Sequence, residues 1–436
     1  MEWERPASAT ASARRGSLVA VYDSTRADER AQLDILLLDA EYRQTLAALR
    51  AYSRMGLSAG VVASVAEATG APAFASRYAR VRAIAPDFAA DPRGYVDALL
   101  ELLDMYPARM LLPAHDGSIA ALRSRRAEIE QKTALPLASE AALEIAVSKP
   151  RTLAVAEQLG VAVPLSLLVT TPAEARAAFR ALGQPTVFKP AQSWAENESG
   201  GARLSVNAVL SEEDAEREAR YILQAGGQAL AQEFLPGWRE AVSVFYADGQ
   251  ILARFAQRSY REFPVLGGVS TLCESIPPTR DLIEPAERLV RAIGLEGCSM
   301  VEFRRDREDR PVLMEINARP AGSLALAVRC GVNFPQLLYN WALGRPLQPV
   351  ASYRTGKRLR WLSGDIWNLN QTLAHQGQPD VSPRGRAIRT FFTDFALRPS
   401  ALDFVAPRDM RPALVEFQHV VLRPLLRKAR KSNPLA

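Results

Sequence analysis

Cysteine, lysine and aromatic residues are all scarce in this chain of 436 residues, and the shortages of cysteine and of aromatic residues each exclude a class of site. The three cysteines, Cys273, Cys298 and Cys330, have neither the spacing of zinc ligands nor the pattern of a disulfide framework. Aromatic residues make up 7% of the chain and are scattered along it. A nucleic-acid site built on stacked aromatic side chains is therefore not expected, and we expect no nucleic-acid partner.

Long apolar runs are also missing. No run approaches the roughly 20 residues that a transmembrane helix needs. The N-terminal stretch MEWERPASATASARRGS lacks the apolar segment of a secretory signal. With 48% hydrophobic and 23% charged residues, the composition is typical of soluble globular proteins. We therefore expect a cytoplasmic protein without a transmembrane segment, organised as about three domains or as two with elaborations.

Lysine accounts for six of the 54 basic residues, and the other 48 are arginine. A chain that prefers arginine so strongly can keep lysine where a compact point charge matters. Lys149, at the start of a predicted helix, and Lys189, inside the apolar strand TVFKPA, are the candidates for such a role. Each can also be an ordinary residual lysine, although a surface position suits Lys189 poorly.

The order of predicted elements indicates two kinds of fold. Strands and helices alternate from residue 33 to about 130, which predicts a parallel α/β layer. No GxGxxG motif follows its first strand, so a dinucleotide site is not expected there. Hairpins with intercalated helices follow and favour an α+β fold. Residues 1–32 are predicted to be a disordered or loosely attached extension. Residues 346–436 are predicted to form a C-terminal extension ending in a basic amphipathic helix, docked on the body rather than on an acidic membrane.

The segment VLMEINARP, residues 312–320, carries the clearest chemical signal. Paired as antiparallel strands, MVEF and LMEI place Glu302 opposite Glu315, with their Cβ atoms about 4.5–5.5 Å apart. Two carboxylates at this distance repel each other, and a divalent cation between them removes the conflict. Asn317 shares the face of Glu315, and Arg319 is close enough to reach phosphate oxygens. The alternative is a surface hairpin with charged side chains in water, which the apolar neighbours of both glutamates disfavour.

This string resembles the metal-binding signature of the ATP-grasp superfamily. That signature has an acidic residue on one strand and, about a dozen positions later, Glu-x-Asn, often followed by arginine. The resemblance covers roughly residues 33–345, and the REFP and GGVST strings are similar to those of predicted ATP-grasp carboligases. It implies a parallel α/β pre-ATP-grasp domain at 33–135, followed by a two-lobed ATP-grasp domain at 136–345. The small lobe would cover about 150–232 and the large lobe about 233–345.

The resemblance also implies roles for individual residues. The metal ligands would be Glu302, Glu315 and Asn317. Arg258 and Arg319 would stabilise the transferred phosphoryl group. The ATP-binding residues fall into four groups along the chain: two phosphate-binding lysines, a glycine loop, an adenine hinge and a ribose-binding carboxylate. They are, in that order, Lys149 and Lys189; Ser199, Gly200 and Gly201; Glu233, Phe234 and Leu235; and Glu240.

The segment that follows, RFAQRSYREFPVLGGVSTLCES, and the later PAGS provide candidates for the binding of other substrates. They are Arg261, Gly267, Gly268, Ser270 and Ser323. For the glycine loop a simple linker remains the alternative, and for the adenine hinge a plain strand and turn.

The implied activity is that of a ligase that uses ATP with Mg²⁺ or Mn²⁺. A carboxylate attacks the γ-phosphate of ATP to give an acyl phosphate and ADP, and an amine (or a thiol) then attacks the acyl phosphate. The partners would be a small-molecule carboxylate and a small-molecule amine, and a homodimer is one assembly to expect. Two alternatives remain open. One is an ATP-grasp carboxylase that uses bicarbonate, and the other is a non-catalytic ATP-binding regulatory module.

Overall fold

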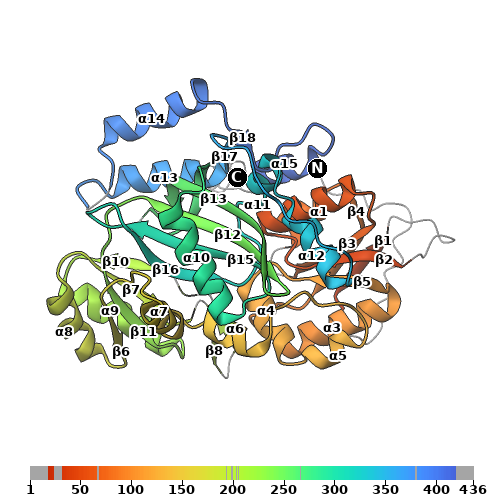
Figure 1. Cartoon of the computed structure of the whole chain (residues 1–436), viewed down its shortest axis with the longest axis horizontal. Helices are drawn as coiled ribbons and strands as arrows, with labels where there is room; N and C mark the ends of the chain where they lie inside the picture. The colour runs from red at the N-terminus through yellow and green to blue at the C-terminus, as the bar shows by residue number, and fades with distance from the viewer. Residues whose placement is uncertain are drawn as a thin grey trace, which may run out of the picture. The chain divides into compact units, whose positions relative to one another are not determined.

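The computed structural model describes residues 18–23, 32–65, 68–192, 194–197, 200–202, 204, 206–265, 267–378 and 381–418 (Figure 1). The chain divides into two compact units. The first unit comprises Met1–Pro136, Tyr339–Arg345 and Phe404–Ala436, and the second comprises Leu137–Leu338 and Pro346–Asp403. None of the helices in the described ranges has both the length and the apolar character that crossing a membrane requires.

The first unit contains a five-stranded sheet in the order β1-β4-β3-β2-β5. Its strands β2 to β5 run parallel, as the alternation of strands and helices predicts. In chain order the strands are β1 (Ala20–Asp23), β2 (Leu33–Leu37), β3 (Ala59–Ser64), β4 (Ala79–Ala85) and β5 (Ala108–Leu112). The helices are α1 (Arg43–Arg54), η2 (Ala68–Gly70), α2 (Pro72–Ala75), α3 (Pro92–Met105), α4 (Asp116–Arg123), α5 (Arg126–Glu130) and α15 (Arg411–Phe417).

Strand β1 departs from the expected N-terminal extension. It pairs antiparallel with β4 at the edge of the sheet, so Ala20–Asp23 is part of the folded unit. Val21 and Tyr22 have the side chains that strands favour, which gives this short segment a reason to pair. Most of the remaining predicted extension, residues 1–17 and 24–31, lies outside the described residues.

A buried ion pair ties residues far apart in sequence together within the first unit. Arg50 on α1 lies with its Nε atom 3.0 Å from Oδ2 of Asp409. It also donates a hydrogen bond from Nη2 to the carbonyl oxygen of Phe404, at 2.9 Å. The hydroxyl of Ser76 donates to the same Asp409 oxygen at 2.8 Å. Because both charged groups are buried, this pairing determines where residues 404–409 attach.

The second unit contains two main sheets, which are antiparallel except for the parallel pair β17–β18 at one edge of the larger sheet. The smaller has the order β10-β7-β11-β6, and helices α8 and α9 pack against it. Its strands are β6 (Ser166–Val169), β7 (Thr186–Pro190), β10 (Asn207–Val209) and β11 (Ala229–Glu233), and its helices are α8 (Pro172–Leu182) and α9 (Glu212–Gln224). Ser211 caps α9 by accepting a hydrogen bond from the Asp214 backbone at 3.1 Å, as its capping-box-like sequence predicts.

The larger sheet has seven strands in the order β16-β15-β12-β13-β14-β17-β18. They are β12 (Arg239–Ala247), β13 (Gln250–Phe263), β14 (Val269–Ser275), β15 (Gly297–Arg305), β16 (Pro311–Asn317), β17 (Arg358–Arg360) and β18 (Ala401–Leu402). The predicted turn at Asp248 and Gly249 joins β12 to β13, and both residues have positive φ, +51° and +74°. A tight hairpin turn needs this backbone conformation, which Asp and Gly tolerate.

The remaining elements of the second unit flank these sheets. They are α6 (Glu140–Ala146), α7 (Lys149–Gln158), the small hairpin of β8 (Ala195–Asn197) and β9 (Gly200–Ala202), α10 (Arg280–Ile293), α11 (Leu324–Cys330), α13 (Leu362–Ala374) and α14 (Arg384–Ala396). Helix α12 (Phe334–Ala342) follows α11 in the chain. Helix α13 packs on β13, and α14 packs on α13 (Figure 1).

The C-terminal region is not the separate extension that the sequence predicts. Residues 346–403 belong to the second unit, because β17 extends its large sheet beside β14 and β18 pairs with β17. Residues 404–418 belong to the first unit. The predicted basic amphipathic helix is described only as α15, and residues 419–436 lie outside the described residues.

Replacing Asp409 by alanine is expected to lower the free energy of unfolding by about 3–5 kcal/mol, because it leaves the buried Arg50 without its carboxylate. The matched control is Asp104→Ala, which removes an exposed ion pair with Lys132 in the same unit. This change is expected to cost at most about 1 kcal/mol. Urea unfolding measures both, and equal losses would contradict the role given to Asp409.

Candidate functional site

The two glutamates of the hairpin lie directly opposite each other. Glu302 on β15 pairs with Glu315 on β16, as the sequence predicts. Asn317 donates a hydrogen bond from Nδ2 to Glu302 Oε1 at 2.9 Å and a longer one to Glu315 Oε1 at 3.5 Å. Glu302 and Asn317 are buried, whereas Glu315 is half-buried. Two carboxylates and a carboxamide therefore share one face of the large sheet.

Basic side chains neutralise these carboxylates. Lys149 lies with Nζ 3.3 Å from Glu315 Oε2, and Arg239 lies with Nε 2.8 Å from Glu302 Oε2. Arg319 donates from Nη2 to Asn317 Oδ1 at 3.0 Å. Burial raises the pKa of Glu302 above its ordinary value, Arg239 opposes this, and Glu315 adds to it. Negatively and positively charged side chains therefore lie side by side on this face. An added cation or anion would change the balance of charge between them.

Lys149 and Lys189 are both brought to this hairpin. The backbone N–H of Lys149, the first residue of α7, donates to the Ala191 carbonyl at 2.8 Å, so the helix starts beside the end of β7. Lys189 on β7 is buried and donates to the Met314 carbonyl at 3.3 Å. Burial, together with the positive charge of Lys149, lowers the pKa of Lys189 to about 7. An anion beside these lysines would favour their charged forms.

The sequence did not single out Arg239, although it lies on the face of the sheet that carries Glu302. Glu240 and Arg258, which were predicted to belong to the site, lie on the opposite face. Side chains alternate between faces along a strand. Ala241 pairs with Glu302, so Arg239 and Ala241 share the carboxylate face. Glu240 pairs instead with Phe303 and Arg258.

The roles predicted for Glu240 and Arg258 are therefore corrected. Glu240 is buried and accepts from Arg258 Nη2 at 2.6 Å, while its other oxygen lies 2.8 Å from Arg305 Nε. Arg258 also lies over the Trp238 ring, with its Cζ atom 5.6 Å from the ring centroid. Both carboxylate oxygens of Glu240 are occupied by guanidinium groups, which leaves neither residue placed to act beside Glu302. Arg239, one position earlier, lies on the face of Glu302 instead.

The predicted adenine hinge connects β11 to β12. Glu233 ends β11, and its Oε1 atom accepts from the Leu165 backbone at 2.8 Å. Leu235 is buried, and Phe234 is half-buried. Along the chain, the hinge therefore connects the smaller sheet to the larger one. Its role in binding adenine stays a prediction.

The predicted glycine loop is described only in part. Ser199 lies outside the described residues, whereas Gly200 and Gly201 belong to β9. A Cβ atom at Gly201 would lie 2.3 Å from the Trp194 ring, so packing alone requires glycine there. Packing therefore explains why residue 201 is glycine, independently of phosphate binding. The role of Gly200 and Gly201 in binding phosphate stays a prediction.

The candidate substrate residues divide into two groups. Ser323 donates to Gln257 Oε1 at 2.6 Å, Ser270 contacts the hydroxyl of Ser259, and the Gly268 carbonyl accepts from Arg239. Gly268 cannot be replaced without strain, because a Cβ atom there would lie 1.9 Å from the Phe263 carbonyl carbon.

Gly267, which completes this turn, has a φ of +144°, a conformation that favours glycine. Arg261, in contrast, is held by two carboxylates of the C-terminal helices. Its Nε atom lies 2.6 Å from Asp365 Oδ1, and its Nη1 atom lies 2.7 Å from Asp394 Oδ2.

The donor atoms of the hairpin suit a hard cation. In the described part of the chain, no three His, Cys, Asp or Glu side chains gather as a metal site. The hairpin instead offers two carboxylates and the carbonyl oxygen of a carboxamide. Mg²⁺ and Mn²⁺ accept such oxygen ligands and complete their shells with water or phosphate. Glu302, Glu315 and Asn317 therefore fit a divalent cation that arrives with a phosphate ligand.

A family model and several known proteins are similar in sequence to this chain. Residues 227–364 match the family model described as ATP-grasp in the biosynthetic pathway with Ter operon. The formate-dependent phosphoribosylglycinamide formyltransferase of Anaeromyxobacter dehalogenans is 30% identical over 329 residues, which cover 68% of this chain and 78% of that protein. The D-alanine–D-alanine ligase of Gloeobacter violaceus is 29% identical over 180 residues, 38% of this chain. The chain spans 57% and 63% of the two D-alanine–D-alanine ligases that it matches.

Solved structures confirm the fold. Biotin carboxylase from Campylobacter jejuni has a TM-score of 0.58 at 18% identity, over 75% of this chain and 74% of that chain. L-amino acid ligase from Bacillus licheniformis has a TM-score of 0.54 at 17% identity, over 75% of this chain and 79% of that chain. At these identities the similarity concerns the fold alone, and it matches the fold predicted from the sequence.

Replacing Arg239 by methionine is expected to lower the free energy of unfolding by about 3–5 kcal/mol, because Glu302 stays buried without its partner. Mg²⁺ is expected to restore part of this loss, since a divalent cation can neutralise the two glutamates. The control Arg254→Met breaks a more exposed pair between β13 of the same sheet and Glu287 on α10, and it is expected to cost at most about 1 kcal/mol. Urea unfolding with and without Mg²⁺ tests this, and a response to Mg²⁺ that is equal in both variants would contradict it.

Proposed function

We infer that this chain, which belongs to the ATP-grasp superfamily, is an ATP-dependent ligase that joins a carboxylate to an amine. The proposal is supported above all by one observation. Lys149, Lys189 and the pair Glu302–Glu315, which come from separate parts of the chain, meet at one hairpin. Lysines beside paired carboxylates suit a phosphate group and its divalent cation together.

The chemistry assigned to these residues is the activation of a carboxylate by ATP. The carboxylate oxygen attacks the γ-phosphorus, the bond to the β-phosphate oxygen breaks, and the products are an acyl phosphate and ADP. The amine then attacks the acyl carbon, phosphate leaves, and the amine loses a proton to solvent. Mg²⁺ or Mn²⁺, held by Glu302, Glu315 and Asn317, would offset the negative charge of the phosphates. Positioning and electrostatics carry the rate, so the reaction needs no protein nucleophile.

Each residue of the face has one part in this scheme. Lys149 and Lys189 hold phosphate oxygens, and Glu302, Glu315 and Asn317 hold the cation. Arg319, hydrogen-bonded to Asn317, faces the phosphoryl group as it is transferred. Arg239 takes the place of the discarded Arg258 as the second guanidinium on this face.

The names of the relatives support this class of reaction. One matched protein is named a D-alanine–D-alanine ligase and another a formate-dependent formyltransferase, and a structural neighbour is an L-amino acid ligase. Each name describes that protein, and the carboxylate and the amine of this chain are not carried over from them. A cytoplasmic location and a homodimer, both expected from the sequence, stay predictions.

The purified protein is expected to release ADP and phosphate from Mg-ATP only when a carboxylate is supplied, with further turnover when an amine is added. Replacing Glu315 by glutamine is expected to slow this release by more than about a hundredfold, because the divalent cation that offsets the charge of the phosphates loses one of its charged ligands. The control is Glu308→Gln, an exposed glutamate on the turn between β15 and β16. Pools of amino acids and small carboxylates, with and without amines, serve as substrates.

Other product patterns would contradict the proposal. Release of AMP and pyrophosphate would mean adenylation rather than acyl phosphate formation. ADP release that depends on bicarbonate would indicate a carboxylase. Binding of ATP without turnover on every pool would favour a regulatory module.

A further inference from the structure

A cavity of about 650 Å³ lies within the second unit, between the large sheet and helices α13 and α14. Its walls come from the start of β12, the end of β13, β15 and the two helices. Small-molecule sites in proteins typically have volumes of about 300–1,000 Å³. The cavity is therefore large enough for a metabolite, and it is separate from the lysines that face the carboxylate hairpin.

The lining of this cavity is strongly basic. It contains six arginines against two carboxylates, Glu262 and Asp394. The arginines are Arg239, Arg261, Arg304, Arg358, Arg386 and Arg398. So many guanidinium groups around one space repel each other unless anions offset their charge. The two lining carboxylates, together with Glu274, Glu302 and Asp365 behind the lining, pair with four of the six.

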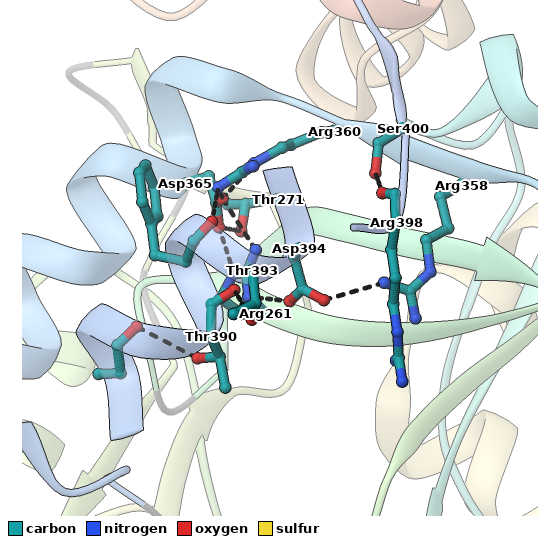
Figure 2. Close-up of polar contacts among 12 residues, drawn as sticks. Arg261, Thr271, Arg358, Arg360, Asp365, Thr390, Thr393, Asp394, Arg398 and Ser400 are labelled. Carbon is teal, nitrogen blue, oxygen red and sulfur yellow. Dashed lines mark hydrogen bonds and ion pairs between the residues drawn. The ribbon is translucent and has the colours of Figure 1, made fainter. Parts of the chain in front are cut away.

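Four of these arginines pair with carboxylates, and two of the four, Arg261 and Arg358, build the wall. Arg261 lies between Asp365 and Asp394, at 2.6 Å and 2.7 Å (Figure 2). Arg358 pairs with Glu274 at 2.6 Å. It also pairs with the other oxygen of Asp394 at 3.1 Å (Figure 2). Asp365 is fully buried and also pairs with Arg360. This network attaches α13 and α14 to strands β13 and β17, and it fixes the position of the wall.

Two other arginines lack such a partner. Arg386 lies in the first turn of α14, and Arg398 lies two residues after its end. Both are exposed to the cavity and solvent, and neither forms an ion pair within the described ranges. They stand at opposite ends of one helix. Their guanidinium groups are therefore available to two separate anionic groups of a ligand.

The cavity adjoins the carboxylate hairpin through shared residues. Arg239 lines the cavity, and its Nε atom lies 2.8 Å from Glu302 Oε2. Glu262 also lines it and lies 3.4 Å from Arg239. A molecule in the cavity is therefore next to the proposed site of phosphoryl transfer. Helix α14 lies outside residues 227–364, the range that matches the family model.

We propose that this cavity binds the non-nucleotide substrate of the ligase, a small molecule with at least two anionic groups, and that Arg386 and Arg398 select it. This rests on the proposed function. Arg304 and Arg239 face the end of the molecule that lies toward Glu302. The half-exposed Trp238 and Tyr260, whose ring centroids are 5.7 Å apart, provide an aromatic edge for its carbon skeleton.

The test uses isothermal titration of the full chain with citrate and with phosphoglycerate, which present carboxylates alone and carboxylate with phosphate. Acetate is the single-charge comparison. The variant R386A/R398A removes both free guanidinium groups. The matched control R384A/R389A makes the same change in charge around the same helix, at exposed arginines that do not line the cavity. Mg-ATP binding is measured on each protein in parallel.

The unmodified chain is expected to bind citrate or phosphoglycerate more tightly than acetate. R386A/R398A is expected to lose at least about tenfold in that affinity, because each charge-assisted hydrogen bond contributes about this much or more. The control variant should change by less than about twofold, and Mg-ATP binding should be retained by both. Whichever anion binds more tightly identifies whether the ligand carries phosphate.

Three results would overturn the proposal: no binding of either anion at millimolar concentration, equal losses in the two double variants, or citrate that competes with Mg-ATP in the unmodified chain. The failure of the proposed function looks different. In that case Mg-ATP would not bind, or Glu315→Gln would not affect turnover, whatever the result with citrate.

Discussion

Two carboxylates, Glu302 and Glu315, face each other across one hairpin, and the rest of the site depends on this pair. Burial and like charge make such a pair unfavourable unless cations lie beside it. In this chain Lys149 and Arg239 supply that charge, and each reaches the hairpin from a different element. The same requirement that stabilises the fold therefore produces a face of alternating charges. Mg-ATP, which brings both a cation and phosphates, matches that face without leaving any charge unpaired.

The fold and the core of this site could be predicted from the sequence, because their signals are local. Alternating strands and helices predict the parallel sheet of the first unit, and the turn residues Asp248 and Gly249 predict a hairpin. The register that opposes Glu302 to Glu315 follows from two short strands and the turn between them. The lysines could be singled out because lysine is rare in this chain. Their convergence on the hairpin came from the resemblance rather than from the residues themselves.

The parts that could not be predicted depend on which face a side chain takes, or on contacts over long sequence distances. Glu240 fits the expected spacing from Glu233, yet one position along a strand reverses the face, so Arg239 and not Glu240 lies on the side of Glu302. Nothing in the sequence pairs Arg261 with Asp365 and Asp394, since these residues follow no local period. For the same reason the C-terminal region looked like an extension, although it completes the large sheet and encloses the basic cavity.

The most direct test of the central claim is a crystal structure of the chain with Mn²⁺ and a non-hydrolysable ATP analogue, using the anomalous signal of manganese. The account predicts a manganese peak bonded to Glu302, Glu315 and Asn317, with phosphate oxygens at Lys149 and Lys189. It also predicts that Arg239 stays on the side of the metal, whereas Glu240 and Arg258 remain paired on the other face. A metal bound elsewhere, or phosphates held beside Glu240 and Arg258, would contradict it.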